Sequence, residues 1–246
     1  IDRIKKTQYN LVISKEELNK KIKNKKDLLE IKKQEKLNYL TDKNSQLISL
    51  EKIKKNENKL AAELKKNNAE RREIAKAVKR AIEDEIKALE KLKKAKFSLT
   101  PEGLAISKSF NQNKGKLIWP VERGEITSKY GRHQHHVVAT AIVDNNGIDI
   151  TTSKNANVRS VFDGKVTSVL IIPGAGRVVM VSHGEYRSVY ANLQEVYVKK
   201  GDTVKSKQKL GKLLAKESGI SESHFEIWRI LSSGMNTVNP SLWLAK

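Results

Sequence analysis

The first 100 residues contain no glycine and no proline, although the whole chain has 13 glycines and 4 prolines. All of these residues lie at or beyond Pro101. Glycine costs a helix interior about 1 kcal/mol and proline about 3 kcal/mol relative to alanine, and both residues mark turns and loops. A stretch this long without either residue predicts an α-helical arm over residues 1–98, followed by a part of different construction.

Apolar residues recur along the arm at intervals that suit a coiled coil. Most are three, four or seven positions apart, at Leu11, Leu18, Ile22, Leu29, Leu37, Leu40, Leu47, Leu50, Leu60 and Leu64. Such intervals keep side chains on one narrow stripe of a helix, here named the seam. We expect a partner helix to cover the seam, from an upstream segment or from self-association with a second copy. Because the chain begins at Ile1 in the middle of this pattern, we also expect an upstream segment that would have held any signal peptide.

Two polar places compete as interruptions of the arm helix. Asn67 and Asn68 are favoured, because asparagine competes for backbone hydrogen bonds and prefers helix caps. A second helix would then run over residues 69–95. The alternative break lies at residues 41–45, which would form the tip of a helical hairpin.

A short helix is predicted directly after the arm. Thr100 is a good N-cap, Pro101 suits the first helical position, and the acid Glu102 faces the positive end of the helix dipole. The helix should run over residues 101–110 within a segment, 99–114, that ends as a polar linker.

From Leu117 onward the pattern is typical of β structure. Residues 159–162 and 165–169, separated by Asp163 and Gly164, predict a hairpin with a tight turn. Residues 178–181, 188–193, 196–198 and 225–230 are further strand candidates. The sequence therefore predicts an α+β protein in which a compact, mostly antiparallel β domain occupies residues 115–246.

Charge and composition narrow the range of partners. The formal net charge is +21, of which +13 falls in the first 100 residues. Lysines and glutamates interleave there, and only Tyr9 and Tyr39 precede Phe97 as aromatic platforms, which disfavours nucleic acid. An anionic polymer or membrane surface fits the dispersed positive charge better. The absence of cysteine excludes disulfides and thiolate metal sites, and no apolar run approaches the roughly 18 residues of a membrane span.

Two short motifs in the β domain contain the candidate metal-ligating and catalytic residues. They are Asn145-Asn146-Gly147-Ile148-Asp149 and Glu222-Ser223-His224. Residues 115–246 resemble the lysostaphin/LytM-type zinc endopeptidases, a duplicated-hybrid-motif fold whose corresponding motifs read H-x-G-x-D and H-x-H. The resemblance implies that Asp149 and His224 match two zinc ligands, whereas Asn145 occupies the position of the third ligand. It also implies that Glu222 and Asn192 replace active-site histidines.

A hydrolytic zinc site needs three protein ligands, an open position for water and a nearby base. The substitutions therefore predict a degenerate site without catalysis, metal or cofactor, in which Asp149 and His224 form a hydrogen-bonded pair. Weak metal binding by these two residues is the alternative. A cluster of His133, His135 and His136 could also hold a metal, but a polar loop facing solvent is favoured there. We expect His183 to be a histidine of a turn at a strand end.

The whole layout resembles that of the EnvC-type murein hydrolase activators, loosely over residues 1–100. Residues 116–121, Lys-Leu-Ile-Trp-Pro-Val, and 238–243, Val-Asn-Pro-Ser-Leu-Trp, carry the resemblance at the ends of the β domain. It implies a periplasmic, non-catalytic activator of N-acetylmuramoyl-L-alanine amidases in cell separation. It further implies a coiled coil that docks on an FtsE–FtsX type membrane complex, with peptidoglycan as another partner. An active zinc endopeptidase and a structural cell-wall-binding protein are the alternatives.

In the activator interpretation, the former catalytic groove binds the amidase. Its expected walls are Asn145, Asn146, Asp149, Tyr190, Asn192, Glu222 and His224. Something must close it until a signal arrives, and the candidate plug is the 101–110 helix with Leu104, Ile106 and Phe110. The alternative is that this helix merely caps the β core.

Overall fold

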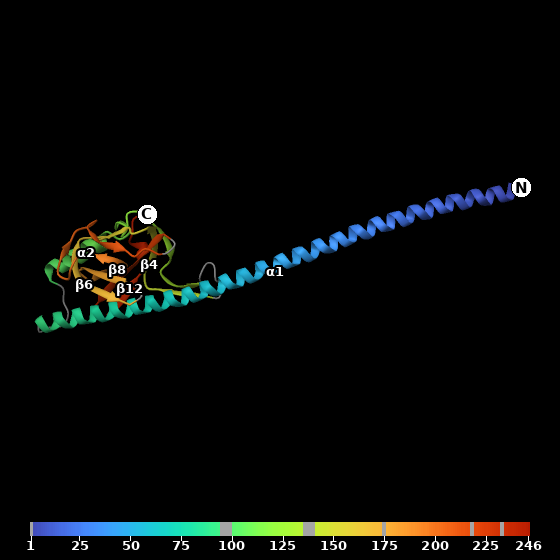
Figure 1. Ribbon diagram of the computed structural model, residues 1–246. Coiled ribbons are helices and arrows are strands. Elements are labelled where there is room, and N and C mark those ends of the chain that lie inside the picture. Colours follow the sequence, from blue (N-terminus) through green and yellow to red (C-terminus); the bar gives the residue numbers. More distant parts are fainter. Residues whose placement is uncertain (1, 94–99, 135–140, 174–175, 217–218, 232–233) are drawn as a thin grey trace. The chain divides into compact units, whose positions relative to one another are not determined.

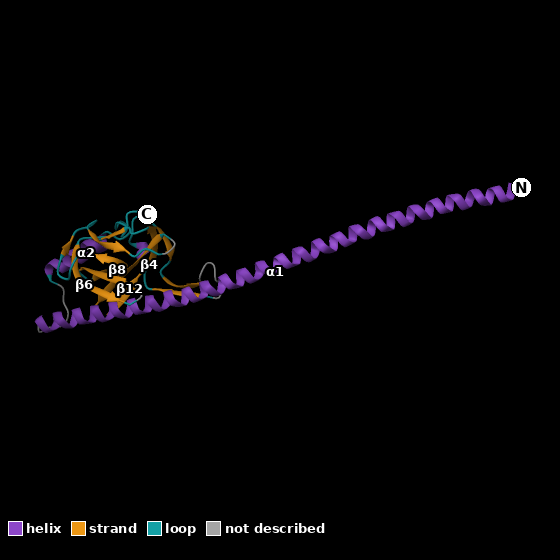
Figure 2. Cartoon of the chain, viewed as in Figure 1, coloured by secondary structure: helices purple, strands orange, loops and turns teal. Residues whose placement is uncertain are grey.

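The computed structural model describes residues 2–93, 100–134, 141–173, 176–216, 219–231 and 234–246. The chain divides into two units, residues 1–59 and 60–246. A long helix, α1 (Asp2–Lys93), is followed by a short helix, α2 (Pro101–Gln112), and then by the β domain (Figures 1 and 2). The α+β fold with an antiparallel sheet domain is therefore confirmed. Within the described residues, no helix has the length and apolarity that crossing a membrane requires.

Helix α1 is continuous, so the predicted break at residues 67–68 is wrong, as is the alternative hairpin at residues 41–45. The propensity penalty of asparagine in a helix is under about 0.7 kcal/mol, which tertiary contacts easily outweigh. The side chain of Asn68 is used in such contacts: its Nδ2 donates to the Ile142 carbonyl at 2.9 Å. At the alternative position, the Thr41 hydroxyl donates back to the Leu37 carbonyl and therefore fits inside a helix.

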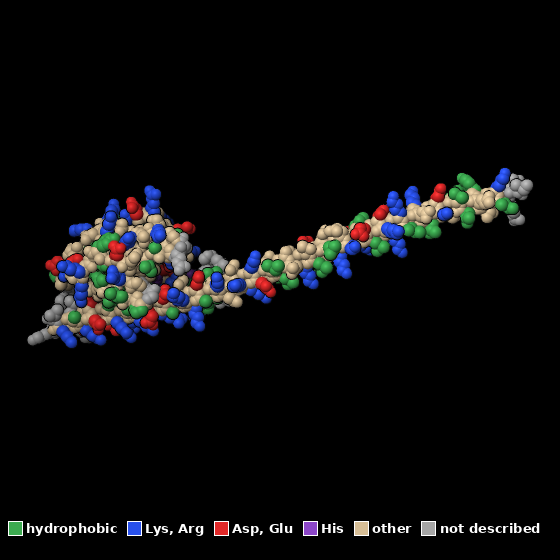
Figure 3. Space-filling view, viewed as in Figure 1, with side chains coloured by type: hydrophobic (Ala, Val, Ile, Leu, Met, Phe, Trp, Pro, Cys, Tyr) green, Lys and Arg blue, Asp and Glu red, His purple; other side chains and the backbone are tan. Residues whose placement is uncertain are grey.

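The seam divides between the two units. In residues 1–59 the apolar side chains are exposed, among them Leu18, Leu29 and Leu47. Figure 3 shows such side chains on the surface of this helix, interleaved with lysines. Leu60 and Leu64, in contrast, pack against Val143 of the β domain rather than against another helix. Cover of the remaining seam by a partner helix stays a prediction.

The β domain is built on one large antiparallel sheet. Its strands are β1 (Glu125–Ser128), β4 (Ile148–Ser153), β5 (Asn157–Arg159), β6 (Gly164–Ile172), β7 (Gly176–His183), β8 (Tyr186–Val196), β9 (Thr203–Val204), β10 (Lys209–Leu213), β11 (Ile220–Leu231) and β12 (Gly234–Val238). The main path runs β1-β4-β11-β8-β7-β6-β9, with β12 beside β11 and β10 beside β5 and β8. Strands β2 (Gly131–Gln134) and β3 (Ile142–Asn145) form a separate pair, and a 3₁₀ turn covers Pro240–Leu242.

Strands β7, β8 and β11 contain the candidates at 178–181, 188–193 and 225–230, whereas β8 ends at Val196 within the 196–198 candidate. The predicted hairpin over residues 159–169 is wrong: β5 pairs with β10, and β6 pairs with β7 and β9. The Asp163 carboxylate does not close a tight turn, because it accepts hydrogen bonds from the Ser206 backbone and from Lys205.

Both faces of the sheet are buried. On β7, Val179 and Val181 point into the main core, whereas Val178 and Met180 point to the opposite face. This alternation is the ordinary period of a strand. The second face is covered by Ile74, Val78 and Ile82 of α1, which are at most 2% exposed. Residues 60–86 of α1, here named the covering segment, are thus part of the domain's packing (Figure 1).

Helix α2 is fixed to the main core by its last turn. Its start agrees with the prediction, since the Gly103 backbone N–H donates to the Thr100 hydroxyl at 3.1 Å. Phe110 is fully buried, and its ring centroid lies 4.8–5.1 Å from those of His183, Tyr186 and Trp243. The helix therefore caps the β core through an aromatic cluster.

Candidate functional site

Strands β4 and β11 bring the two matched ligand positions together. Asp149 and His224 lie opposite each other in the antiparallel register, and each is 2% exposed. The His224 Nδ1 and the Asp149 Oδ1 are 2.6 Å apart. The predicted Asp–His pair is therefore present. Gly147 allows it, because a Cβ at this position would lie 2.2 Å from the Phe225 carbonyl oxygen of β11.

A second carboxylate contacts the other side of His224. Its Nε2 lies 2.9 Å from Glu226 Oε1, and the Trp228 indole donates to Glu226 Oε2 at 2.6 Å. Burial alone would lower the pKa of His224, but its hydrogen bonds to Asp149 and Glu226, with their charges, raise this pKa to about 10. His224 is therefore an imidazolium between two carboxylates at neutral pH. Glu226 was not predicted from the sequence, although the two-residue period of a strand places it on the face of His224.

Asn145 completes the site as a hydrogen-bond donor. Its Oδ1 accepts from the Gly147 backbone N–H at 3.0 Å, which fixes the orientation of the amide. Its Nδ2 then donates to Asp149 Oδ2 at 3.3 Å and to Ser128 Oγ at 3.1 Å. The residue at the third ligand position thus presents N–H groups, not a lone pair, to Asp149.

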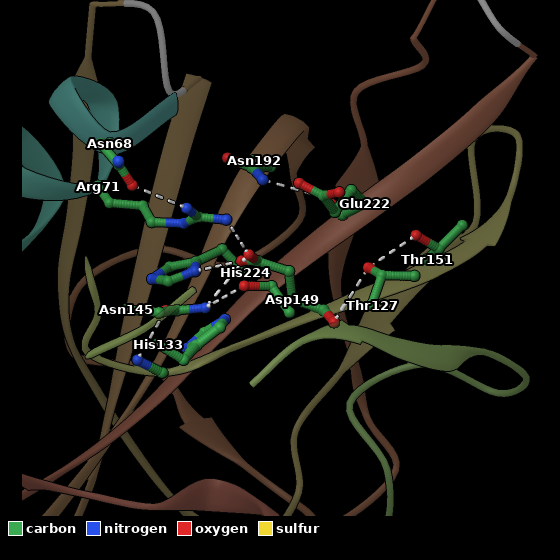
Figure 4. Close-up of polar contacts among 12 residues, drawn as sticks. Asn68, Arg71, Thr127, His133, Asn145, Asp149, Thr151, Asn192, Glu222 and His224 are labelled. Atoms are coloured by element: carbon green, nitrogen blue, oxygen red, sulfur yellow. Dashed lines mark hydrogen bonds and ion pairs between the residues drawn. The ribbon is translucent and has the colours of Figure 1, made fainter. Parts of the chain in front are cut away.

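The last member of the site comes from α1. Arg71 donates to Asp149 Oδ2 through Nη2 and to Asn68 Oδ1, at 3.3 Å, through Nη1. Figure 4 shows its side chain extending from the helix toward Asp149. Burial acts to raise the pKa of Asp149, but the hydrogen bonds and charges of His224 and Arg71 outweigh it and lower this pKa to about 2. The cluster then holds two carboxylates and two cations and is neutral.

These contacts do not fit a zinc ion. Zinc needs deprotonated ligands with free lone pairs. Both ring nitrogens of His224 face carboxylates, both oxygens of Asp149 face cationic groups, and Asn145 contributes donors. Among the described residues, no group of three or more His, Asp or Glu side chains is placed to hold a metal ion.

The covering segment fills the groove. A cavity of only about 30 Å³ remains, lined by Asn67, Glu70, Arg71 and Ile74 of α1 with Asp149, Asn192, Glu222 and His224. Asn192 donates to the Glu222 carbonyl at 3.2 Å, and the Glu222 carboxylate accepts from Lys216 at 3.0 Å. Five of the seven expected wall residues gather here: four line or contact this cavity, and Asn145 bonds to Asp149.

Two expected wall residues lie elsewhere. Asn146 lines a neighbouring cavity of about 240 Å³ beside Arg71 and Arg72. Tyr190 is not a wall residue: it is fully buried in the main core, where its hydroxyl accepts from the Val161 N–H at 2.9 Å. The bulk and apolar character of its ring favour that position over a polar groove.

The 101–110 helix is not the plug. Leu104 is 54% exposed, Phe110 is buried in the main core, and neither they nor Ile106 line the groove cavity. The physical reason is that Phe110 fits the aromatic cluster around Trp243, whereas the covering segment supplies both a cation and apolar side chains to the groove. No local pattern marks Arg71 as a member of the site, since its partner lies 78 positions away.

The two other described histidines, His133 and His183, do not join the site's cluster. His133 lies on β2, where its Nδ1 is 3.1 Å from the Gly131 carbonyl oxygen, and His135 and His136 fall outside the described residues. His183 ends β7, directly before the turn at residues 184–185, and is fully buried. It lies between the Asp163 carbonyl and the Ser188 hydroxyl, each at 2.7 Å. Burial lowers the pKa of His183 to about 4.

Known proteins resemble the β domain. The family model for peptidase family M23 matches residues 143–240. Over 111 residues the chain is 34% identical to the peptidoglycan DD-endopeptidase ShyB of Vibrio cholerae, covering 44% of this chain and 25% of that protein. Over 119 residues it is 34% identical to an uncharacterized metalloprotease of Haemophilus influenzae, covering 46% and 25%. The chain thus spans about a quarter of the length of these curated relatives.

Solved structures cover a similar part. Csd3 of Helicobacter pylori has 26% identity and a TM-score of 0.43, over 53% of this chain and 33% of that one. A zinc-containing peptidase from Vibrio cholerae has 29% identity and a TM-score of 0.42, over 52% and 40%. The family match includes Asn145, Asp149 and His224, whose strands and spacing carry the site. Residues 143–240 therefore form a LytM-type domain of peptidase family M23.

Proposed function

We propose that this protein is a non-catalytic activator of peptidoglycan amidases, the N-acetylmuramoyl-L-alanine amidases that act in cell separation. Its degenerate M23 groove binds the amidase, and the covering segment of α1 holds the groove closed. The observation that carries the proposal is the ion pair between Arg71 of α1 and Asp149, a matched ligand position. A helix that already occupies the groove is a model for a partner helix that could replace it.

The absence of catalysis in this proposal rests on the chemistry of the donors. A zinc-bound water would need three ligands with free lone pairs and an open position. Here the Asn145 amide donates to Asp149, and His224 is held as an imidazolium. Peptidoglycan as the site of action is proposed from the family and from ShyB, a peptidoglycan DD-endopeptidase.

Closure is supported by two ion pairs of the covering segment. Arg71 pairs with Asp149 near its middle, and Glu85 pairs with the buried Arg187 at 2.7 Å near its end. Between them, Ile74, Val78 and Ile82 are buried, each worth about 1.5–3 kcal/mol. Closure is thus favoured at rest, and an external input is needed to shift the population. In our proposal residues 1–59 receive that input from an FtsE–FtsX type membrane complex in the periplasm.

The test is a dye-release assay with purified cell wall, an amidase and the full chain. We expect Arg71→Glu to raise amidase activation several-fold over the wild type, because the introduced carboxylate faces Asp149 and opens the groove. Arg80→Glu, the same charge change at an exposed position of the same helix, is the matched control. Leu104→Glu on α2 should also leave activation unchanged. Equal activation by the wild type and Arg71→Glu would contradict closure by α1, and no activation by either would contradict the proposed function.

An active zinc endopeptidase is the second candidate, favoured by the similarity to ShyB and by the matched positions Asp149 and His224. It predicts one zinc per purified chain and cleavage of peptidoglycan crosslinks by the protein alone. Elemental analysis of the purified full chain, with chromatography of digested cell wall, separates the two candidates.

A further inference from the structure

The charges of the groove constrain what can occupy it when α1 leaves. With α1 in place, the positive charges of Arg71 and His224 balance the negative charges of Asp149 and Glu226. Each side chain lies within hydrogen-bonding distance of the next in the order Arg71, Asp149, His224, Glu226. Both His224 nitrogens serve carboxylates, so His224 supplies one positive charge against two negative ones. Departure of Arg71 leaves one negative charge without a partner.

This charge would be kept from water under any helix that covers the groove as α1 does. The side chain of Asp149 is 3% exposed and that of Glu226 is fully buried with α1 in place. A carboxylate that is removed from water without a cationic partner is strongly destabilising. An apolar or acidic helix in the groove would bury Asp149 without a cationic partner, whereas a cationic one would restore the charge balance.

The geometry favours a guanidinium over an ammonium group. Arg71 uses one terminal nitrogen for Asp149 Oδ2 and the other for Asn68 Oδ1 of the same helix, three positions earlier, which holds the planar group in one orientation. A replacing helix would need its own acceptor at that spacing to orient its arginine in the same way. Figure 4 shows this fork lying between Asn68 and Asp149. A lysine, as a point charge without this fork, would meet Asp149 with less precision.

Apolar positions follow the arginine at helical intervals. Ile74, Val78 and Ile82 lie three, seven and eleven positions after Arg71 and cover Met180, Val189 and Trp228 of the sheet. An occupant that left this apolar surface in water would lose the burial that α1 supplies. The complete footprint is therefore one arginine followed by a row of apolar residues on one face of a helix.

Resting on the function proposed above, we propose that the amidase segment that replaces α1 is an amphipathic helix that presents an arginine to Asp149. The covering segment is then an internal copy of the recognition feature of the partner. The Asp149 carboxylate binds Arg71 when the groove is closed and the arginine of the amidase when it is open. The covering segment and the amidase helix therefore cannot occupy the groove together.

The first arm of the test uses a defined probe. A fluorescent peptide of residues 64–88 is titrated into the full chain opened by Arg71→Glu with Ile74→Glu. We expect its Arg71→Ala form to bind at least tenfold more weakly and its Arg80→Ala form to bind unchanged. Adding Asp149→Asn to the opened chain should weaken its binding of the unmodified peptide to the level of the Arg71→Ala peptide. Binding of the Arg71→Ala peptide itself should not weaken further.

Binding of the Arg71→Ala peptide within twofold of the unmodified one would overturn the requirement for a cation. If circular dichroism shows that the opened chain has lost its β domain, Val78→Asp serves as the opening substitution.

The second arm uses the amidase. The opened chain should activate it, excess unmodified peptide should abolish activation, and the Arg71→Ala peptide at equal concentration should not. An arginine-to-glutamate scan of the amidase should find one variant that the opened chain no longer activates and that the same chain with Asp149→Arg activates again. Activation that survives Asp149→Asn unchanged would refute this inference and leave the proposed function standing. An opened chain that activates no amidase, yet binds the peptides as expected, would refute the proposed function instead.

Discussion

His224 holds the site together through its charge. Its ring lies between Asp149 and Glu226, and the positive charge lets two buried carboxylates coexist within one small volume. Removing one partner of such a buried group leaves the others uncompensated, which is more costly than the loss of one hydrogen bond. The matched ligand residue has thus become a structural cation.

The pKa values predict how stability depends on pH. The pKa of His224 rises from 6.5 to about 10 on folding, so its contribution is complete below pH 6.5 and is lost as the pH rises through 10. The pKa of Asp149 falls from 3.8 to about 2, so its contribution is complete above pH 3.8 and is lost as the pH falls through 2. We expect the difference in unfolding free energy between the wild type and His224→Gln to shrink between pH 7 and 10, measured by urea titration. A difference that stays constant over this range would show that His224 is neutral in the folded protein.

Zinc binding should depend on Arg71 as well as on Asn145. We expect Asn145→His alone to gain little affinity for zinc, because the guanidinium still occupies Asp149. Asn145→His with Arg71→Ala should bind zinc at least tenfold more tightly, measured by calorimetry. Asn145→His with Arg80→Ala is the control for the loss of a positive charge. Equal affinities of all three variants would mean that Arg71 does not compete with a cation.

The sequence predicted part of this site for identifiable reasons. Asp149, His224 and Asn145 were predicted through the resemblance of their motifs to those of the zinc endopeptidases, and the register of β4 and β11 brings Asp149 and His224 together. Glu226 could have been found from the two-residue period of a strand, which places it on the face of His224. Arg71 could not, since a helix residue among many lysines and arginines carries no local mark of its partner. Tyr190 was misplaced because the motif gives position along β8 but not which face a core aromatic residue takes.

At the scale of elements, α1 is bound to the sheet by more than its apolar row. Glu85 Oε1 and Oε2 accept hydrogen bonds from the Arg187 guanidinium, at 2.7 and 3.3 Å. Arg187 also donates to the Gly184 and Tyr186 carbonyls, so it stays partly satisfied if α1 moves. This bond and the Arg71 pair have opposite polarity, which fixes the direction of the helix on the sheet.

Glu85→Ala should loosen the end of the covering segment. We expect the unfolding free energy to fall by about 1.5–3 kcal/mol, the usual range for a hydrogen bond to a charged group, and hydrogen exchange in residues 78–86 to speed up. Asp84→Ala, at the neighbouring exposed acid, should change neither quantity. If Glu85→Ala also left both unchanged, the Arg187 contact would contribute nothing to docking.

Elements were predictable where the signal was local. The start of α2 follows from Thr100 and Pro101, which act within one turn. The break at residues 67–68 was wrong because a weak propensity was weighed without the tertiary contact of Asn68 with Ile142. The hairpin at residues 159–169 was wrong because the turn residues Asp163 and Gly164 say nothing about which strands pair.

At the scale of the whole molecule, residues 1–59 and 60–246 use one helix for two purposes. The second unit buries its share of the seam against its own β domain, whereas Leu18, Leu29, Leu40 and Leu47 of the first unit are each more than half exposed. Apolar stripes of this length are typical of helices that pair with others.

Self-association should therefore reside in residues 1–59. We expect the full chain to form dimers in sedimentation experiments at high concentration, and Leu29→Glu with Leu40→Glu to remain monomeric. Lys25→Glu with Lys36→Glu, which changes exposed charges of the same helix, is the control. A chain that stays monomeric at every concentration would contradict self-association through the seam.

The ion pair between Arg71 and Asp149 also bears on how the domain depends on the supply of zinc. In a zinc enzyme the ion neutralises the acidic ligand, so a cell short of zinc leaves that carboxylate without its counter-charge. Here the neutralising charge is encoded in the chain and cannot be withdrawn by a chelator or a competing metal importer. We therefore expect a chelator to leave the thermal unfolding of this domain unchanged.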